Sequence, residues 1–471
     1  MLLRNDTIAA LSTPAGRGAI AIVRLSGGDA HQLAARVVQP WPSAPRRVTL
    51  CTLRDERDGR VLDRALVTRF DAPHSYTGEP MVELACHGGV AVSAAVLEQM
   101  IFLGARPAEA GEFSQRAVLN GKMDLLQAEA VGDLVDARTH ALRRVALAQL
   151  DGGLSRVLND LRDRAIHIEA LLAYDIDFPE EDDGPVSRAT IGAAARETQL
   201  AIDRLLTTVP LGEVARDGAL VVIAGPPNAG KSSLFNALLG QTRAIVTDVP
   251  GTTRDAIEAR VESEHWPLRL IDTAGLRDTS EVVERLGIEV SERYVHEAHL
   301  VLVCAETRDA LQDALSRLNG MGSAPRIAVF TKSDQPRASE DVHEDVHEDA
   351  QDDAQDDARA VDGAVSLVEV SAATREGLDG LLAEVHRVLA RSVGDVDSEQ
   401  PIVTRARHRV ALEEARVELD HFLTLWETRR VPVSVAAIHV RSATHALDDL
   451  IGSVDVDDVL ERVFRTFCVG K

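Results

Sequence analysis

The sequence predicts a multidomain protein built from α/β and α elements, with an α/β domain inserted into a helical one. A glycine-rich loop in the middle of the chain follows an apolar run and precedes a helix-like segment. Near the N-terminus, β-like runs alternate with Gly and Pro turns, and helical periodicity fills the regions on both sides of the loop. The 471 residues and 45% hydrophobic content are enough for several domain cores.

The first 122 residues predict a small α+β domain. Its β-like runs lie at 18–25, 65–69 and 81–86, and turn residues separate them. This domain is expected to end near Lys122, where the pattern changes to apolar residues spaced by three and four.

Two helical stretches flank the inserted domain. The first is expected over 123–216 and the second within 393–471, most clearly over 404–467. We expect them to pack together as one discontinuous helical domain around an α/β domain at 217–392. Two independent bundles are the alternative, because periodicity alone does not fix how helices pack.

A phosphate-binding loop begins the inserted domain. The apolar strand 219–224 runs into 225–232 (GPPNAGKS), which fits the pattern GxxxxGKS, and a helix-like segment begins at Ser233. Backbone N–H groups of such a loop surround phosphates, Lys231 reaches the terminal phosphates, and the Ser232 hydroxyl ligates Mg²⁺. The loop therefore predicts a nucleoside triphosphate site, and a chance Gly-rich turn is the alternative.

Three further segments fit the same site. The strand 268–271 ends in a DxxG pattern, whose Asp holds the Mg²⁺ shell and whose Gly N–H senses the γ-phosphate, and the segment 251–255 (GTTRD) supplies a switch threonine. The strand 326–330 runs into TKSD, where Asp334 accepts the N1–H and N2–H of guanine and so selects GTP over ATP. Thr331 stands where the usual motif NKxD has Asn, which leaves one base-side hydrogen bond open. The residues expected to contact GTP are Asn228, Ala229, Gly230, Lys231, Ser232, Ser233, Thr247, Asp248, Val249, Pro250, Gly251, Thr252, Thr253, Asp272, Thr273, Ala274, Gly275, Lys332, Asp334, Ser371 and Ala372.

The residue after the DxxG pattern bears on hydrolysis. Ras-like enzymes place there a glutamine that orients the attacking water. This chain has Leu276, whose apolar side chain cannot do so. The chain therefore either hydrolyses GTP poorly or recruits a polar group from the next segment. The candidates, each otherwise an ordinary solvated helix residue, are Arg277, Glu281, Glu284 and Arg285.

Charge and cysteine content exclude several classes of protein. A formal net charge of -24 argues against a broad basic surface for nucleic acid, so any RNA contact must be local or shared with a partner. The four cysteines have no CxxC or metal-ligand spacing, and nothing resembles a signal peptide or a membrane-length apolar run. We expect a cytoplasmic protein with reduced thiols and no membrane association.

A low-complexity acidic repeat lies within 338–362 of the inserted domain. Its tetrads at 340–359 (EDVH, EDVH, EDAQ, DDAQ, DDAR) hold ten carboxylates with no Lys or Arg between 340 and 357. On a helix this period stacks like charges, so we expect a solvated insertion on a surface loop. His343 and His347 have a spacing that invites a metal ion, but a solvated pair is the favoured interpretation.

Dense local matches make the chain resemble the MnmE (TrmE) family of tRNA-uridine modification GTPases over essentially its full length. The matching segments are 5–8 (NDTI), 14–18 (PAGRG), 76–79 (YTGE), 87–89 (HGG), 111–114 (GEFS), 177–179 (DFP), 228–233 (NAGKSS), 247–255 (TDVPGTTRD), 272–277 (DTAGLR) and 467–471 (FCVGK). The acidic repeat and TKSD are the clear departures, and Val469 is a mild one from the usual terminus FCIGK.

The resemblance implies a homodimer with Ras-like GTPase domains that become active when K⁺ fills the position of an arginine finger. Carried over, Glu284 is the catalytic residue that orients water, and Ser232 and Thr253 hold Mg²⁺. The implied K⁺ ligands are Asn228, Thr247, Val249 through its carbonyl, and Thr252.

The resemblance also implies that the N-terminal domain, 1–122, binds a reduced folate, either 5-formyl- or 5,10-methylene-tetrahydrofolate. The residues it points to are Arg24, Glu83, Lys122 and the terminal Lys471. A carboxylate suits pterin N–H donors, and Arg or Lys suits the glutamate tail. Cys468 has either a chemical role near the folate or the role of a small buried hydrophobe.

The implied function is the addition of an aminomethyl-type group to C5 of the wobble uridine of certain tRNAs, together with an FAD-containing partner of the MnmG type in a heterotetramer. Folate supplies the carbon, and GTP hydrolysis drives opening and closing of the dimer. One alternative is a ribosome-assembly GTPase that acts as a binding switch without folate chemistry. Another is a folate-dependent transferase with vestigial GTPase activity.

Overall fold

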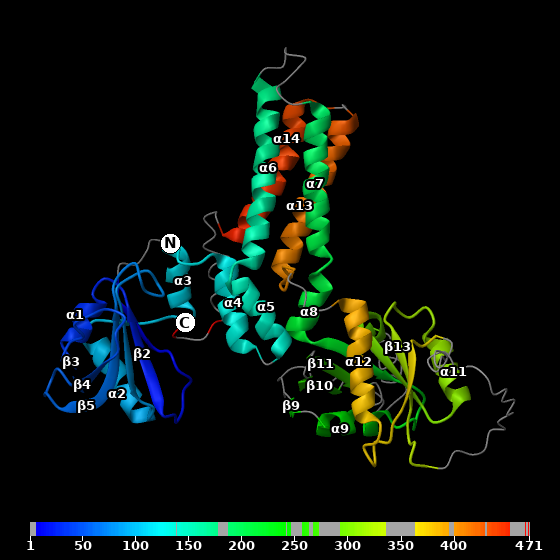
Figure 1. Ribbon diagram of the computed structural model, residues 1–471, viewed down its shortest axis with the longest axis horizontal. Coiled ribbons are helices and arrows are strands. Elements are labelled where there is room, and N and C mark those ends of the chain that lie inside the picture. The colour runs from blue at the N-terminus through cyan, green and yellow to red at the C-terminus, as the bar shows by residue number, and fades with distance from the viewer. Residues whose placement is uncertain are drawn as a thin grey trace, which may run out of the picture. The chain divides into compact units, whose positions relative to one another are not determined.

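The computed structural model describes residues 6–137, 139–177, 187–241, 243–245, 257–262, 267–272, 293–335, 363–394, 400–428, 431–452, 467 and 470. Contacts divide the chain into two compact units. The first unit comprises 1–135, 149–194 and 421–471, and the second comprises 136–148 and 195–420. Figure 1 shows the sheets and helices that are named below.

The first unit contains a seven-stranded sheet in the order β3-β4-β5-β6-β2-β1-β7. All its strand pairs are antiparallel except β1 with β7. The strands are β1 (Ile8–Leu11), β2 (Ile20–Ser26), β3 (Val38–Gln39), β4 (Thr49–Arg54), β5 (Val61–Phe70), β6 (Met81–His87) and β7 (Arg106–Pro107).

Side chains alternate between the two faces of this sheet. On one face, Val23 and Leu84 are fully buried in a core that also holds Val96 of α2 (Val90–Phe102) and residues of α1 (Ala30–Ala35). On the other face, Leu50 and its cross-strand partner Leu66 are 66% and 44% exposed. The helices therefore cover one face and leave apolar side chains exposed on the other.

The remaining helices of the first unit come from both ends of the chain. They are α3 (Glu112–Leu119), α4 (Leu125–Asp136), α6 (Gly153–Asp177) and α14 (Val433–Ile451). Helices α6 and α14 lie side by side in Figure 1. Arg162 of α6 forms an ion pair of 2.7 Å with Asp448 of α14, and the Thr444 hydroxyl donates to Glu169.

The first residue of α7 (Arg188–Leu206) contacts the end of α13 (Ala406–Thr428). The Arg188 guanidinium lies 3.5 Å from the Trp426 ring centroid, and the Trp426 indole donates to the Arg188 carbonyl at 3.0 Å. Segments on either side of the inserted domain are thus joined by a cation–π contact and a hydrogen bond.

The second unit contains a seven-stranded sheet in the order β14-β13-β12-β8-β11-β10-β9. Neighbours from β14 to β11 are parallel, whereas β10 is antiparallel to β11 and to β9. The strands are β8 (Ala219–Ala224), β9 (Arg243–Ile245), β10 (Ile257–Glu262), β11 (Leu268–Asp272), β12 (Leu300–Ala305), β13 (Arg326–Phe330) and β14 (Ser366–Glu369).

Helices cover both faces of this sheet. Leu234 of α9 (Lys231–Gln241) and Leu381 of α12 (Leu378–Val393) are buried in the core of one face. Leu311 of α11 (Arg308–Leu318) is buried in the core of the other face. A parallel sheet with fully buried strands requires this double cover.

Helices α5 (His140–Leu150) and α8 (Val209–Asp217) also contribute to the first of these cores. For this reason the second unit includes 136–148, which the sequence pattern assigns to the helical domain. The predicted domain boundaries at 122, 216 and 392 stay predictions, whereas the broader expectation of α/β and helical parts is confirmed.

The strands expected at 219–224 and 326–330 are confirmed residue for residue, and those at 18–25, 65–69, 81–86 and 268–271 are confirmed within a few residues. The acidic repeat lies outside the described residues. No helix among the described residues is long and apolar enough to cross a membrane.

Candidate functional site

The carboxyl ends of four parallel strands carry most of the described residues expected to contact GTP. The phosphate-binding loop follows β8, and Asp272 ends the neighbouring strand β11. Residues 331–334 follow β13 and 371–372 follow β14. Loops at this edge of a doubly covered parallel sheet are the usual place for a nucleotide.

The phosphate-binding loop has the backbone conformation that its sequence requires. Gly225 has φ 143°, and a Cβ there would lie 2.2 Å from the Cys304 carbonyl oxygen, so only glycine fits. Asn228 adopts the left-handed conformation with φ 63°, which asparagine tolerates better than most residues. Its side chain is exposed.

Two charged groups of opposite sign approach the end of β8. Lys231 is 6% exposed, and its ammonium donates to the carbonyls of Gly225 at 2.9 Å and Pro226 at 2.7 Å. Asp272 is buried and pairs in register with Ile223 of β8. Burial raises the pKa of the Cys304 thiol to about 12, while Lys231 lowers it and Asp272 raises it. The charges of Lys231 and Asp272 therefore both act on the surroundings of the Cys304 thiol.

The donor types at this loop suit a hard cation. Ser232, at the start of α9, is exposed, and Asp272 supplies a carboxylate at the end of the adjacent strand. Mg²⁺ prefers oxygen ligands of these kinds beside phosphates. These two side chains fit the Mg²⁺ that the loop motif implies.

Thr331 ties the guanine-reading segment to the phosphate-binding loop. Its hydroxyl lies 2.9 Å from the Ala229 carbonyl oxygen and 3.3 Å from that of Ala305, so its single proton serves the nearer acceptor. A Cβ at Gly230 would lie 3.3 Å from the Thr331 Cβ, which shows how closely the two segments approach. A hydroxyl thus links segments that the sequence separates widely.

The carboxylate expected to read guanine is held by a buried serine. The Ser371 hydroxyl donates to Asp334 Oδ1 at 2.7 Å and accepts from the Thr374 N–H at 3.1 Å. Ser371 is fully buried, whereas Asp334 is exposed. Lys332, with φ 58°, forms an ion pair with Glu306. The structure therefore brings Asp334 and Ser371 together, as the guanine site requires.

Several expected site residues lie outside the described residues. This holds for the switch and DxxG residues, the expected catalytic residue and two residues of the C-terminus. They are Thr247, Asp248, Val249, Pro250, Gly251, Thr252, Thr253, Thr273, Ala274, Gly275, Glu284, Cys468 and Lys471.

A second cluster of expected site residues lies on the N-terminal sheet. Arg24 of β2 and Glu83 of β6 are cross-strand partners, and the guanidinium donates to Glu83 Oε1 from Nε at 3.1 Å and from Nη2 at 2.8 Å. The guanidinium carbon lies 5.5 Å from the Tyr76 ring centroid and 5.6 Å from that of Phe113. This combination offers charge, hydrogen bonding and aromatic surface to a ligand.

The penultimate residue of the chain lies at this cluster. The Ser12 hydroxyl donates to the Gly470 carbonyl at 2.9 Å, and Arg24 Nη1 lies 3.5 Å from the same oxygen. A Cβ at Gly470 would lie 2.4 Å from the Leu11 carbonyl oxygen, so glycine permits the approach. The Lys122 ammonium donates to the Pro73 carbonyl at 3.0 Å. The structure thus joins two of the expected residues, Arg24 and Glu83, places the Gly470 carbonyl beside them, and gives Lys122 a separate local partner.

Sequence reasoning missed the aromatic part of this cluster and the serine that holds the C-terminus. Tyr76 and Phe113 lie in the segments YTGE and GEFS, which drew attention only as family matches. Their rings face Arg24 only through tertiary packing, which spacing along the chain does not reveal. Ser12 carried no signal in the sequence.

Comparisons with known proteins cover nearly the whole chain. A family model described as "MnmE helical domain" matches residues 125–468, and one described as "GTP-binding protein TrmE N-terminus" matches residues 7–122. Among solved structures, the G domain of the T. maritima FeoB iron transporter matches 36% of this chain and 98% of its own chain, at 24% identity. The TM-score of this match is 0.25, which is too low for the likeness to bear on the fold.

Curated relatives match from end to end. The tRNA modification GTPase MnmE of Moorella thermoacetica is 40% identical over 99% of this chain and 100% of its own length. The proteins of the same name from Akkermansia muciniphila and Methylobacterium radiotolerans are 38% and 42% identical, over 99% of both chains in each case. On these matches, the chain belongs to the MnmE family of tRNA modification GTPases.

Proposed function

We propose that this chain is a K⁺-activated GTPase that modifies tRNA. With an FAD-dependent partner of the MnmG type, it adds a folate-derived aminomethyl or carboxymethylaminomethyl group to C5 of the wobble uridine of certain tRNAs. The observation that carries the GTPase part is the convergence of Lys231, Asp272 and Asp334 at one edge of a parallel sheet.

The loop geometry supports the cation part of the proposal. Asn228 is exposed and left-handed at the middle of the phosphate-binding loop, where its amide oxygen is available to a K⁺ ion. Bound K⁺ supplies positive charge against the phosphates, a contribution worth about 10³ to 10⁵ in rate when an arginine provides it. Thr247, Val249 and Thr252 complete the proposed K⁺ ligands, Thr253 joins Ser232 at Mg²⁺, and Glu284 orients the attacking water.

The Arg24 cluster supports the folate part. Arg24 and Glu83 offer donors and acceptors beside two aromatic rings, which suits a flat pterin with a charged tail. The carbonyl of Gly470 lies at the same place, and Cys468 and Lys471 are its near neighbours in sequence. We propose that these C-terminal residues complete a reduced-folate site with Lys122.

The exposed sheet face supports a homodimer. Leu50, Leu66, Val48 and Ile20 are between 44% and 66% exposed, and apolar patches of this kind commonly mark protein interfaces. Because Arg24 and Glu83 lie on strands of the same sheet, a dimer formed here would place two folate sites near the interface.

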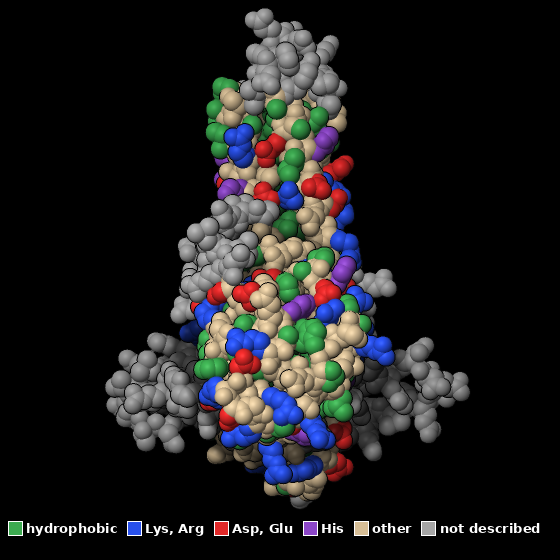
Figure 2. Space-filling model, turned by 90° about the vertical axis from the view of Figure 1, so that its left-hand side faces the viewer, with side chains coloured by type: hydrophobic (Ala, Val, Ile, Leu, Met, Phe, Trp, Pro, Cys, Tyr) green, Lys and Arg blue, Asp and Glu red, His purple; other side chains and the backbone are tan. Residues whose placement is uncertain are grey.

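The charge of the N-terminal domain supports a local contact with tRNA. Residues 1–122 hold fourteen Lys or Arg against twelve Asp or Glu, whereas the whole chain holds 51 against 75. Figure 2 shows Lys and Arg side chains beside hydrophobic ones on the face of this domain. The exposed arginines of the N-terminal domain include Arg46, Arg47, Arg60 and Arg64. We propose that the partner supplies the remaining contacts to the RNA.

Folate binding separates this function from a GTPase switch in ribosome assembly. Calorimetry with 5-formyl-tetrahydrofolate is expected to show binding to the wild type and its loss in Arg24→Ala. Arg57→Ala is the matched control, because Arg57 is an ion-paired arginine on the same domain away from Arg24. Absence of folate binding in the wild type would favour the switch.

The modification itself requires reconstitution. Wild-type chain, the FAD-containing partner, GTP, K⁺, a one-carbon folate and unmodified tRNA are expected to yield a C5-substituted wobble uridine, detected by mass spectrometry of tRNA nucleosides. The Glu284→Ala variant is expected to give little product. Modification that proceeds without GTP would count against a coupled GTPase and favour a transferase with vestigial hydrolysis.

A further inference from the structure

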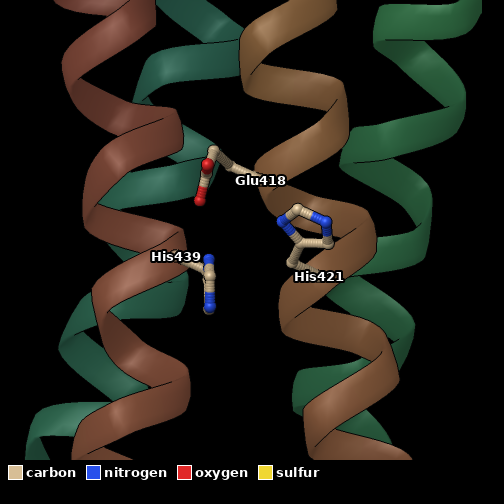
Figure 3. Close-up of side chains that lie close together, drawn as sticks. All are labelled: Glu418, His421 and His439. Atoms are coloured by element: carbon tan, nitrogen blue, oxygen red, sulfur yellow. The ribbon is translucent and has the colours of Figure 1, made fainter.

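Two histidines and a glutamate lie together on α13 and α14, on residues that the GTP and folate sites do not use. The rings of His421 and His439 are 5.4 Å apart between centroids, at an interplanar angle of 67°. Glu418 precedes His421 by three residues on α13, so both side chains occupy the same side of that helix. Figure 3 shows the three side chains directed toward one another.

The ligand atoms are close to the spacing of a metal site. One nitrogen from each histidine and one carboxylate oxygen all lie within 4.8 Å of one another. Ligands on a tetrahedral Zn²⁺ bond at about 2.0–2.2 Å, which places them roughly 3.4 Å apart. Side-chain rotations that bring the ligand atoms closer by up to about 1.4 Å close the difference.

The donor set selects the class of ion. Two imidazole nitrogens and one carboxylate oxygen suit Zn²⁺ and neighbouring transition metals, whereas Mg²⁺ and K⁺ prefer oxygen ligands throughout. Three protein ligands leave the fourth position for water. His421 is exposed and the other two are half-buried, so an ion reaches the site from solvent.

We propose that Glu418, His421 and His439 form a site for a divalent transition metal such as Zn²⁺, which clamps the two helices together. The residues belong to helices that are 23 and 19 residues long. Because Zn²⁺ would bind the folded helices and none of these residues is among those proposed for GTP hydrolysis, the ion is expected to stabilise the fold without taking part in hydrolysis.

Calorimetric titration of the untagged, chelator-treated full chain with ZnCl₂ tests the proposal. His343 and His347 in the acidic repeat are a second possible source of Zn²⁺ binding, so the parent for all comparisons is His343→Ala/His347→Ala. We expect this parent to bind one Zn²⁺ per chain. We expect His421→Ala and His439→Ala each to weaken binding at least about 10-fold, and Glu418→Gln to weaken it less.

The matched control is His445→Ala. His445 also lies on α14 beside a carboxylate, 3.3 Å from Asp449, and is exposed, but it lacks the other two groups. It is expected to leave Zn²⁺ affinity unchanged. Zn²⁺ should also raise the melting temperature of the parent and of His445→Ala, but not of His421→Ala. Because His421 is exposed, its replacement by Ala removes no buried packing that the fold needs.

The proposal is overturned by Zn²⁺ affinity that stays the same in His421→Ala and His439→Ala, or that falls equally in His445→Ala. Co²⁺ gives a further readout, because its visible absorption reports the ligands. A tetrahedral spectrum in the parent that disappears in His439→Ala supports the site. An octahedral spectrum common to all variants indicates adventitious binding and contradicts it.

Discussion

Thr331 holds two parts of the nucleotide site together through one hydroxyl group. The sequence identified this position as a departure from the usual Asn, with one base contact left open. In the structure the hydroxyl donates to Ala229 of the phosphate-binding loop, and the side chain is buried. Threonine therefore retains a link between base and phosphate segments even though it has no amide to offer the base.

We predict that Thr331→Val destabilises the second unit by about 1–3 kcal/mol, because an isosteric methyl leaves the buried Ala229 carbonyl without its donor. Thermal and denaturant unfolding measure the loss. Thr331→Ser keeps the hydroxyl and should lose much less. Equal stability of the Val and Ser variants would show that the hydrogen bond contributes nothing.

We propose that guanine selection depends on Asp334. We predict that Asp334→Asn weakens GTP binding by at least about 100-fold, since the amide cannot accept both guanine N–H groups. The variant should gain affinity for xanthosine triphosphate, whose 2-oxo group accepts the new donor. Competition with a fluorescent GTP analogue measures both affinities. A variant that keeps its preference for GTP would exclude Asp334 as the base reader.

The site residues illustrate what a sequence reveals at this scale. The positions of Lys231, Asp272 and Asp334 follow from strand-then-motif patterns. In the structure Asp272 ends β11, Asp334 lies in the loop after β13, and Lys231 begins the helix after the β8 loop. The Tyr76 and Phe113 rings near Arg24 do not follow, because three separate segments meet there. Contacts of this kind depend on tertiary packing, which short motifs do not encode.

Helix α8 packs against the segment between α12 and α13. Gly212 lies within α8, and a Cβ there would lie 1.9 Å from the Val403 carbonyl oxygen and 2.7 Å from its carbon. The Thr208 hydroxyl accepts from the Val403 N–H at 3.1 Å. The two segments that flank the inserted domain are therefore fixed to one another by a backbone contact that only glycine permits.

We predict that Gly212→Ala destabilises the protein by about 1–3 kcal/mol or more, because backbone must move to admit the methyl group. Gly380→Ala is the matched control, since Gly380 lies in helix α12 with no atom within 4 Å of a Cβ. It should stabilise by about 0.5–1 kcal/mol. Unfolding curves in urea compare the two. Similar shifts in both variants would refute the close packing.

A charged cluster joins α3 to the N-terminal strand region. Arg106 donates to Glu112 and Asp6, and Arg116 donates to the same two carboxylates. Burial alone would raise the pKa of Glu112, but hydrogen bonds from Arg106, the Glu109 N–H and Arg116 outweigh burial and hold the pKa below its ordinary value.

This cluster predicts a loss of stability in acid. A carboxylate whose pKa is lower in the folded state stabilises the protein above its unfolded pKa and loses that contribution as pH falls toward the folded value. The melting temperature should therefore fall as pH drops below about 4.5. Glu112→Gln should be less stable at neutral pH and fall less steeply in acid. Parallel curves for the two proteins would contradict this assignment.

Sequence periodicity predicted most helices and strands, but not which of them lie next to one another in the fold. The helical regions and the strands with strong apolar runs appear where expected, whereas β12, also fully buried, was not singled out. The short strands β3 and β7 consist of two residues each, too few for an alternating pattern. The antiparallel order of the N-terminal sheet also depends on long-range pairing, which local patterns do not encode.

At the scale of the whole molecule, two units carry the two proposed chemistries. One contains the phosphate-binding loop, and the other contains the Arg24 cluster and Gly470. The resemblance over the full length supplied this organisation, and the family matches over 7–122 and 125–468 support an N-terminal part and a helical part. Composition and charge alone gave only the number of domains and a limit on RNA contacts.

We propose that K⁺, held by Asn228, supports GTP hydrolysis in this chain, which has Leu276 where Ras-like enzymes have glutamine. The most direct measurement is the rate of GTP hydrolysis in K⁺ and in Na⁺ for the wild type and Asn228→Gly. Glycine accepts the φ of 63° at this position, so the variant removes the amide without straining the loop. Nucleotide affinity, measured alongside, separates binding from turnover.

We expect the wild type to hydrolyse GTP at least about tenfold faster in K⁺ than in Na⁺, and Asn228→Gly to lose this difference. Equal rates in the two salts for the wild type, or a K⁺ preference that survives in Asn228→Gly, would contradict it.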